Sequence, residues 1–400
     1  MTVTLDEFRR RAADFLAANA VARDEPPVEW SETERVAECR RFHGALADAG
    51  LGGITYPVEY GGQGLDKSYL EAFNRELSGY QAPLLPVTIS HGMCLPVIND
   101  FGTPEQRARH QARIIRADEI WCQMFSEPGA GSDVASLATR AVRDGDQWVL
   151  NGQKVWTSGA QYCDFGLCVA RTDPSQPKHR GLSMFIVDLS LPGVDIRPLR
   201  QMNGSSHFNE IYLTDVQVGH DCLVGGEGQG WNVAVAMLMY ERVAIGAADN
   251  GAMGSRMGST LLIDEARRRG LHTDAVTRDA LADLYIRERV QSFIGMRIRQ
   301  AAAQGRAPGP EGSIAKLNAA ILSRRTADVA IGLTGASGQA WEAGDDDAGQ
   351  WADGVVGAPG MGIAGGTNEV QRNIIGERVL GLPKEPDPYK GQPWEAIPRS

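Results

Sequence analysis

The order of apolar patterns along the chain predicts an α+β multidomain protein. Apolar residues recur at helical spacing over roughly residues 1–120, which predicts an N-terminal α-helical domain. Short β-rich runs separated by glycine and proline turns fill residues 121–228 and predict a middle β domain, either a small barrel or a sandwich. Helical spacing returns over residues 229–400, which predicts a C-terminal helical domain.

The N-terminal region carries the signals of several helices. Five apolar residues recur at helical intervals near its start: Leu5, Phe8, Ala12, Phe15 and Leu16. Pro26 and Pro27 interrupt this pattern, and Ser31 is placed to cap a second helix that stops at Gly50. Further helices are expected near 67–78, 85–101 and 104–116, the last with Thr103 as its N-cap.

The middle region changes to short runs of β-forming residues. These runs lie at 138–143, 147–150, 165–171, 182–188, 194–198 and 208–218. Turn signals such as Asp144-Gly145 and Pro192-Gly193 separate them.

The C-terminal region begins with an unusually apolar helix. Residues 231–248 are apolar almost all round, which is typical of a buried helix. Further helices are expected at 252–269, 275–304, 312–340 and 367–381. The glycine-rich stretch 357–367 is expected to be a loop that leads into the last helix, and the proline-rich tail from Pro383 is expected to be extended.

Composition narrows the class of protein. The 400 residues are 42% hydrophobic and 22% charged with a net charge of −10, which fits a globular protein of two or three domains and does not favour nucleic acid as a partner. The six cysteines form no CxxC pair, so a metal site or a disulfide framework is not expected. No apolar run is long enough to span a bilayer, and the N-terminus has no secretion-signal pattern. We therefore expect a soluble, cytoplasmic protein without a membrane partner.

A glycine-rich turn follows the first strand of the middle region. The sequence from Cys122 to Asp133 is Cys-Gln-Met-Phe-Ser-Glu-Pro-Gly-Ala-Gly-Ser-Asp. Its glycines let the backbone approach a ligand closely and leave N–H groups for phosphate oxygens. Ser126 and Ser132 add hydroxyls that donate or accept hydrogen bonds.

A second motif follows about twenty residues later. Asn151 to Gly159 reads Asn-Gly-Gln-Lys-Val-Trp-Thr-Ser-Gly, which sets the aromatic Trp156 beside the hydroxyls of Thr157 and Ser158. Turn glycines, hydroxyls and a flat apolar surface suit a ring system with a charged tail. From the pattern alone, two β-turns and a tryptophan of the hydrophobic core remain an alternative.

One carboxylate interrupts the apolar helix of the C-terminal region. Glu241 follows Val-Ala-Met-Leu-Met-Tyr, and a carboxylate in such surroundings is costly unless it is paired or used. Burial raises the pKa of a carboxyl group toward the range of a general base. Arg242 points about 100° away on a helix, so it is not the obvious ion-pair partner, although pairing with a distant arginine remains an alternative.

The two motifs of the middle region together resemble the flavin-binding signature of the acyl-CoA dehydrogenase family. This resemblance implies the family's fold, with a middle β-barrel and a C-terminal four-helix bundle, and FAD as the cofactor. It implies that the segment Gln123, Met124, Phe125 and Ser126 runs along the pyrimidine edge of the flavin, with a hydrogen bond from Ser126 to the ring.

The same resemblance assigns further residues to the ligands. Trp156 and Ser158 correspond to residues near the ring face and N5 of the flavin, with Thr157 between them. Ser132 corresponds to a hydroxyl near both the flavin pyrophosphate and the CoA. Thr367, the expected N-cap of the helix that follows the glycine loop, is expected near the flavin, although a solvated loop is an alternative.

The position of the catalytic base departs from the commonest family pattern. Most members carry a glutamate in a Tyr-Glu-Gly-Thr loop, and this chain has Ala-Gly-Gly-Thr there, with Gly365 at the base position. A minority of the family places the glutamate directly before an arginine on the helix that opens the C-terminal domain, as Glu241 and Arg242 stand here. The resemblance thus implies Glu241 as the base, Arg242 near the substrate and the Gly365 N–H on the thioester carbonyl.

These residues predict FAD-dependent α,β-dehydrogenation of an acyl-CoA to the trans-2-enoyl-CoA, with an electron-transferring flavoprotein as the acceptor. A flavin oxidase or monooxygenase of the same fold is one alternative. A non-catalytic partner subunit is another, although Glu241 and the intact flavin motifs argue against it.

Two family elements that contact the flavin of a neighbouring subunit are missing. The region Arg267–Asp283 lacks the Arg-x-x-Phe-Gly motif of homotetrameric members, and Gly332 replaces the usual Gln before a Gly-Gly pair. The chain is therefore expected in a homo- or hetero-tetramer, and the missing contacts favour an α2β2 arrangement like that of the actinobacterial steroid or branched-chain acyl-CoA dehydrogenases. Its 308–316 and 373–383 segments look like that branch.

Overall fold

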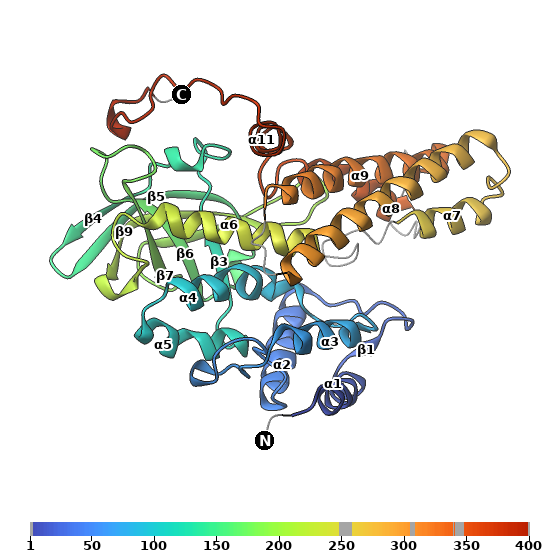
Figure 1. Cartoon of the computed structure of the whole chain (residues 1–400), viewed down its shortest axis with the longest axis horizontal. Helices are drawn as coiled ribbons and strands as arrows, with labels where there is room; N and C mark the ends of the chain where they lie inside the picture. Colours follow the sequence, from blue (N-terminus) through green and yellow to red (C-terminus); the bar gives the residue numbers. More distant parts are fainter. Residues whose placement is uncertain (1–2, 248–257, 305–308, 339, 341–347, 399–400) are drawn as a thin grey trace. The chain divides into compact units, whose positions relative to one another are not determined.

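The protein consists of two compact units in the computed structural model, which describes residues 3–247, 258–304, 309–338, 340 and 348–398 (Figure 1). The first unit comprises Met1–Arg200, Ser206–Met237 and Tyr389–Ser400, and the second comprises Gln201–Ser205 and Leu238–Pro388. Along the chain, a helical region, a sheet region and a second helical region follow one another, which confirms the predicted α+β fold class. The domain boundaries near residues 120 and 228 stay predictions.

Two of the five α-helices described in the N-terminal region begin at predicted caps. The five helices are α1 (Leu5–Asn19), α2 (Glu32–Asp48), α3 (Lys67–Leu77), α4 (Leu95–Phe101) and α5 (Pro104–Ile115). The hydroxyls of Thr4, Ser31 and Thr103 each accept the backbone N–H of the residue three positions later, and the backbone N–H of each cap residue donates to that later residue's side chain. The caps predicted at Ser31 and Thr103 are thereby confirmed.

The helix predicted near 85–101 is present, but its winding changes along its length. A 3-10 turn at Leu85–Val87 and a π-helical turn at Ser90–Cys94 precede α4. Pro86 and Pro96 lie in the first turns of the 3-10 and α segments, where the missing N–H of proline costs least.

The sheet of the middle region has the strand order β10-β7-β6-β4-β5-β9-β8, with β3 paired in parallel to β6. The strands are β3 (Trp121–Met124), β4 (Arg140–Asp144), β5 (Gln147–Ser158), β6 (Phe165–Arg171), β7 (Leu182–Asp188), β8 (Val194–Leu199), β9 (Phe208–Gly219) and β10 (Leu223–Val224). A two-stranded ladder of β1 (Val21–Ala22) and β2 (Tyr80–Gln81) lies outside this sheet. Buried apolar side chains of β5, β6, β7 and β9 form the core of the region.

Strand β5 is much longer than the predicted run at 147–150. It pairs with β9 along its length, and the register shifts between Leu150 and Gly152 and again between Lys154 and Thr157. Such irregularities bend a strand and redirect its side chains. The second motif therefore lies on an irregular strand.

The second unit is built around packed helices. The strongly apolar helix α6 (Gly230–Ala247) begins in the first unit and ends in the second. Helices α7 (Ser259–Arg268), α8 (Ala275–Ala303) and α9 (Glu311–Thr334) share a core of leucine, valine and alanine side chains (Figure 1). The predicted helix at 312–340 ends earlier, at Gly335 with its left-handed φ of 58°. Residues 252–257 of the predicted 252–269 helix lie outside the described residues.

The expectation of a loop over 357–367 is wrong for its first half. Helix α10 spans Ala348–Met361 and contains Pro359. Its burial of Trp351, Ala352 and Ala358 explains why local glycine and proline content does not decide the conformation. Only the segment after Met361 is a turn and loop, and it leads into α11 (Asn368–Ile374).

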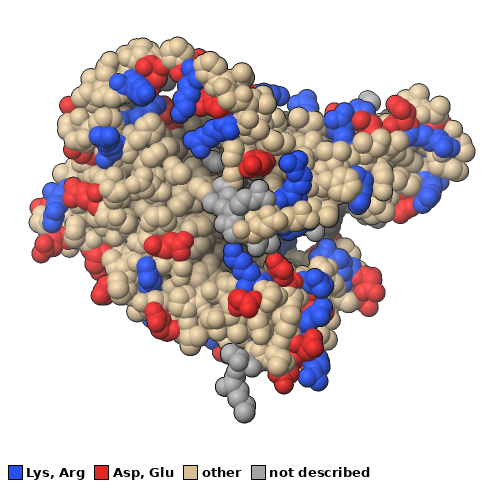
Figure 2. All heavy atoms as spheres, viewed as in Figure 1, with Lys and Arg blue, Asp and Glu red and all other residues tan. Residues whose placement is uncertain are grey.

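Acidic and basic side chains alternate over the face of the molecule shown in Figure 2. Mixed charge of this kind is typical of an ordinary protein surface rather than of a phosphate-backbone groove. Among the described residues, no helix combines the length and apolar character needed to cross a bilayer.

Two histidines pack together in the N-terminal region. His43 of α2 is buried, and its ring lies edge-on to that of His91 at 4.6 Å. Burial lowers the pKa of His43 well below its ordinary value and lowers that of His91 to about 4, although His91 also lies 2.7 Å from the carbonyl oxygen of Ile114. Both rings are therefore held neutral in the folded protein.

This pair predicts a loss of stability on mild acidification. Because the unfolded chain binds protons on these rings near pH 6.5 and the folded chain does not, stability is complete above that pH and falls as the pH drops toward about 4. Thermal melts between pH 7.5 and 5 are expected to show a shallower fall for His43→Phe than for the wild type. The exposed His272→Gln is the control and should follow the wild type; a His43→Phe curve parallel to the wild type would contradict the assignment.

Candidate functional site

The glycine-rich turn after β3 is open to solvent. Glu127 and Ala130 exchange backbone hydrogen bonds of 3.1 and 3.0 Å, which closes a tight turn between them. A Cβ atom built on Gly129 or Gly131 would meet no atom within 4 Å, so this side of the turn has room for a ligand. Ser132, next to it, is exposed.

A buried ion pair holds this turn in place. Lys154 of β5 is fully buried, and its Nζ donates to Glu127 Oε1 at 2.8 Å and to the carbonyl oxygens of Phe125 and Val169 at 3.1 and 2.8 Å. Burial raises the pKa of the Glu127 carboxyl, but the charge and hydrogen bonds of Lys154 outweigh it, so that the pKa is lowered overall. The carboxylate is thus kept charged inside the protein.

The same carboxylate also fixes the chain beyond the turn. Its two oxygens accept the N–H groups of Ala138 and Thr139 at 2.6 and 2.9 Å. Glu127 therefore joins β3, β5 and the start of β4 at one point. The sequence reasoning missed this pair; its signal is that the two motifs contain charged residues of opposite sign, Glu127 and Lys154.

The structure brings the two motifs side by side. The N–H of Val155 donates to the carbonyl oxygen of Ser126 at 2.9 Å. Trp156 follows in the left-handed region, with φ at 61°, and its side chain is 60% exposed. A large residue in this conformation is strained, and such strain clusters at ligand sites. Trp156 is therefore not a residue of the hydrophobic core, so the alternative of a core tryptophan does not hold at this position.

A buried hydroxyl directly follows Trp156 in the sequence. Thr157 is buried, and among the described residues its Oγ1 has no hydrogen-bond partner. Ser158 is half-buried, and the ring of Phe208 lies edge-on to Trp156 at 5.8 Å. An open glycine turn, an exposed aromatic ring and an unpaired hydroxyl fit a flat ring system with an anionic tail.

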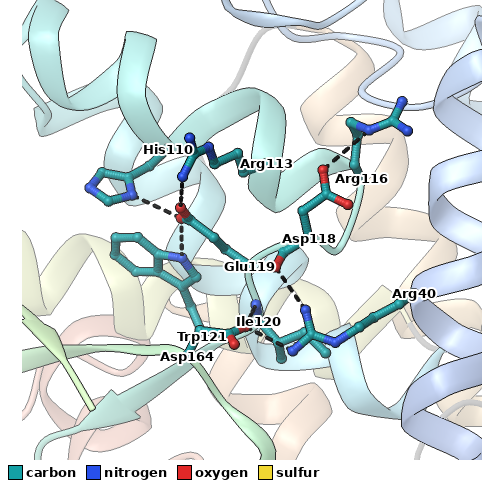
Figure 3. Close-up of polar contacts among 9 residues, drawn as sticks. All are labelled: Arg40, His110, Arg113, Arg116, Asp118, Glu119, Ile120, Trp121 and Asp164. Atoms are coloured by element: carbon teal, nitrogen blue, oxygen red, sulfur yellow. Dashed lines mark hydrogen bonds and ion pairs between the residues drawn. The ribbon is translucent and has the colours of Figure 1, made fainter. Parts of the chain in front are cut away.

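Strand β3, which supplies Gln123 and Met124, is anchored at its start by two carboxylates (Figure 3). Glu119 Oε2 lies 2.8 Å from His110 Nδ1 and accepts the indole N–H of Trp121 at 3.2 Å. Asp164 accepts the N–H of Ile120 at 2.7 Å and pairs with Arg40.

This anchoring ties the strand to the helices of the first unit. Arg40 of α2 also donates to the carbonyl oxygen of Asp118 (Figure 3) and to that of Ala117. Met124 and Phe125 are then buried, while Gln123 and Ser126 are half-buried. The predicted flavin segment thus lies on a rigid support, as an accurate binding site requires.

A second group of predicted residues lies in the other unit. Glu241 of α6 is half-buried, and Lys316 of α9 is buried. Burial lowers the pKa of Lys316, while the negative charges of Glu241 and Glu369 act in the opposite direction. Glu241 is therefore close enough to Lys316 for a direct electrostatic interaction. Arg242 lies on α6, but its side chain is outside the described residues.

The Gly365–Gly366 segment is held from one side by two buried side chains. Lys316 Nζ donates to the carbonyl oxygen of Gly366 at 2.6 Å, and Gln371 Nε2 donates to those of Gly365 and Gly366 at 3.0 and 3.2 Å. Because a trans peptide points its N–H opposite to its C=O, the N–H of Gly366 points away from Gln371.

Backbone conformation explains the two glycines. Gly365 and Gly366 have φ of 64° and 88°, a region that other residues rarely adopt. A Cβ on Gly366 would also lie 2.7 Å from Gln371 Nε2. Thr367 accepts the N–H of Val370, which confirms the predicted N-cap of α11.

The described residues offer no candidate site for a metal ion. They contain no group of three or more His, Cys, Asp or Glu side chains that could hold a metal ion. The six cysteines are free.

Comparison with family models covers most of the chain. The acyl-CoA dehydrogenase N-terminal, middle and C-terminal domain models match residues 2–118, 122–216 and 228–380. Acyl-CoA dehydrogenase IpdE1 of Mycobacterium tuberculosis is 37% identical over 391 residues, which covers 95% of this chain and 98% of IpdE1.

Two solved structures have similar folds. The Tcur3481-Tcur3483 steroid ACAD is 28% identical with a TM-score of 0.78, covering 95% of this chain and 98% of that one. The ChsE4-ChsE5 complex from Mycobacterium tuberculosis is 29% identical with a TM-score of 0.75, covering 96% and 99%. The family resemblance drawn from the sequence, including its branch, is confirmed.

The buried ion pair predicts a large effect of single substitutions. Lys154→Met leaves the Glu127 carboxylate buried without its cation, so urea titration is expected to show a loss of about 3–5 kcal/mol in the free energy of unfolding. The double variant Lys154→Met/Glu127→Leu should lose less than the sum of the two single variants, because neither charge is then left unpaired.

Arg197→Met is the control for this measurement. It removes an exposed ion pair with Asp195 and should change stability by less than about 1 kcal/mol. Equal effects of Lys154→Met and Arg197→Met would show that the buried pair does not brace the fold.

Proposed function

Because the chain belongs to the acyl-CoA dehydrogenase family, we propose that it is a cytoplasmic flavoenzyme that oxidises the α,β bond of an acyl-CoA thioester to the trans-2-enoyl-CoA. One observation carries the proposal: Glu241 is close enough to Lys316 for an electrostatic interaction, and Lys316 also binds the carbonyl oxygen of Gly366. A base and a hydrogen-bonding loop are thereby connected through one buried cation.

The residues of the first unit fit FAD. The open turn at Gly129–Gly131 with Ser132 suits the pyrophosphate, and exposed Trp156 with the unpaired hydroxyl of Thr157 suits the isoalloxazine ring. By family resemblance, Ser126 and Ser158 bind the ring, Gln123, Met124 and Phe125 line its edge, and Thr367 lies near it. FAD, when bound, accepts the hydride that leaves the β-carbon of the substrate.

Glu241 is proposed to take the proton from the α-carbon. That C–H bond is weakly acidic, so the thioester carbonyl must be polarised by donors placed where negative charge develops. We assign the backbone N–H of Gly365 to this role, and Arg242 and Ser132 to the binding of the CoA ester. The carbon–carbon double bond forms as the α-proton goes to Glu241 and the β-hydride leaves.

Lys316 is proposed to hold the Gly365–Gly366 backbone and the Glu241 carboxylate in place relative to each other. Its ammonium fixes the Gly366 carbonyl and gives the Glu241 carboxylate a nearby positive charge. The left-handed conformations of Gly365 and Gly366 also explain why a glycine can stand where most family members have the base: the backbone donor remains, while the carboxylate comes from α6.

A bulky or branched acyl chain, such as a steroid side chain, is the substrate class that we propose. Its support is the similarity to a structure described as a steroid ACAD and the position of Glu241 on a helix instead of the loop. Faster flavin reduction by straight-chain than by branched CoA thioesters would contradict it. For the acceptor we propose an electron-transferring flavoprotein; hydrogen peroxide as the main product in air would instead indicate an oxidase.

Glu241→Gln tests the base. The substitution keeps the shape of the side chain but removes its basicity, so the rate of flavin bleaching near about 450 nm by CoA thioesters should fall by about 1,000-fold. FAD content should remain at the wild-type level. Glu369→Gln is the matched control, because Glu369 also faces Lys316 but is exposed, and its rate should stay near that of the wild type. Full activity in Glu241→Gln would refute the mechanism.

Lys316→Met tests the link between the base and the loop. Loss of the donor to Gly366 should let the Gly365–Gly366 segment shift, and kcat should fall by about 100-fold with a smaller change in KM. Exchange of the substrate's α-proton with D2O, measured by NMR, should slow in parallel. Unchanged exchange would show that Lys316 plays no part in α-proton removal.

A heteromeric assembly is proposed from the missing contacts in trans and from two similar structures that each contain a pair of chains. Purified alone, the chain should carry less than one FAD per subunit. Coexpression with a partner acyl-CoA dehydrogenase chain should raise flavin content and give an α2β2 mass by light scattering. A fully flavin-loaded, active homotetramer of this chain alone would overturn the proposal.

A further inference from the structure

The end of the chain folds back onto the sheet of the first unit. The expected extended conformation after Pro383 holds for residues 383–387, and a turn at 388–391 and a 3-10 turn at Trp394–Ala396 follow. Residues Tyr389–Ser400 belong to the first unit, although the preceding residues belong to the second (dark red in Figure 1). The N–H groups of Trp394 and Glu395 donate to the carbonyl oxygens of Gln176 and Pro174 at 2.9 and 3.1 Å.

Trp394 is the anchor of this segment. Its side chain is 8% exposed, and its indole N–H donates to the carbonyl oxygen of Ser136 at 3.2 Å. The guanidinium carbon of Arg171 lies 4.2 Å from the centre of the Trp394 ring. A cation over an aromatic face is attracted more strongly when both are removed from water, as they are here.

Arg171 binds the backbone on either side of Ser136. Only 3% exposed at the end of β6, it donates to the carbonyl oxygens of Ala135 at 2.7 Å and Leu137 at 3.2 Å. Three consecutive carbonyl groups, those of 135, 136 and 137, are therefore bound by Arg171 and Trp394.

The loop that receives these bonds continues directly from the glycine turn. On its other side, Glu127 binds the N–H groups of Ala138 and Thr139, and Lys178 pairs with Asp133 at 2.8 Å. Within the described part of the chain, Ser132 has no protein hydrogen-bond partner through its hydroxyl or its N–H. The loop is thus held by hydrogen bonds and an ion pair along residues 133–139, while the side chain of Ser132, just before it, is exposed and has no such bond to a described residue.

We propose that the C-terminal segment 389–398 is a strap that positions the Ser132–Leu137 loop to bind the pyrophosphate groups of FAD and of the CoA ester. Trp394 and Arg171 are its positioning residues. This inference rests on the proposed function, which assigns Ser132 to both ligands. Trp394 of the strap binds the carbonyl oxygen of Ser136, and Arg171 beneath its ring binds those of Ala135 and Leu137, so that these three oxygens are held away from an anion.

The test compares ligands with and without a pyrophosphate. In Trp394→Ala, fluorescence titration of the apoprotein should show an FAD dissociation constant about ten-fold above that of the wild type, and the KM for a CoA thioester should rise by a similar factor. At saturating FAD, kcat should stay within about two-fold of the wild type, and so should kcat/KM for the corresponding pantetheine thioester, which lacks the pyrophosphate.

Two further variants keep the test decisive. Trp394→Phe retains a ring over Arg171 but loses the donor to Ser136, and it should give an intermediate FAD affinity even if Trp394→Ala does not fold. Glu395→Ala, an exposed neighbour in the same turn, should match the wild type.

The possible outcomes separate the strap from the proposed activity. Unchanged FAD affinity and KM in both Trp394 variants would overturn the strap, as would an equal loss with the pantetheine thioester, which would indicate a purely structural role. A wild-type protein that binds FAD but oxidises no thioester would refute the proposed activity, while FAD titration would still decide on the strap.

Discussion

The first unit depends on one buried ion pair, between Lys154 and Glu127. Neither charge is stable inside a protein without the other, and each also satisfies backbone groups that would otherwise be buried without partners. Because the lysine comes from one motif and the glutamate from the other, the pair fixes the distance between the glycine turn and Trp156. The open faces on which a flat, anionic cofactor would lie are therefore a consequence of a contact between two buried side chains.

The second unit uses the same device on a smaller scale. Lys316 is buried, binds the carbonyl oxygen of Gly366 and interacts electrostatically with the carboxylate of Glu241. In both units a buried lysine converts flexible glycine-rich backbone into a defined surface. The glycines supply conformations that other residues resist, and the lysines select one of them.

Local sequence signals identified much of this arrangement. The caps at Ser31, Thr103 and Thr367 follow from side chains that bond to N–H groups three residues away, and the structure has all of them. The loop expected over 357–367 fails because α10 is decided by the burial of Trp351 and Ala358, which outweighs the glycines and Pro359. The full length of β5 was equally hidden, since its pairing partner β9 lies far along the chain.

The sequence by itself determined the chemical groups: two motifs with glycines, hydroxyls and a tryptophan, and a single carboxylate on an apolar helix. Only the tertiary structure decided how these groups are held, through Lys154 and Glu127, Lys316 and Gly366, and Trp394 and Arg171. The partners in these contacts are 27, 50 and more than 200 residues apart. No local pattern encodes such pairs, because the benefit of each contact exists only after folding has removed both partners from water.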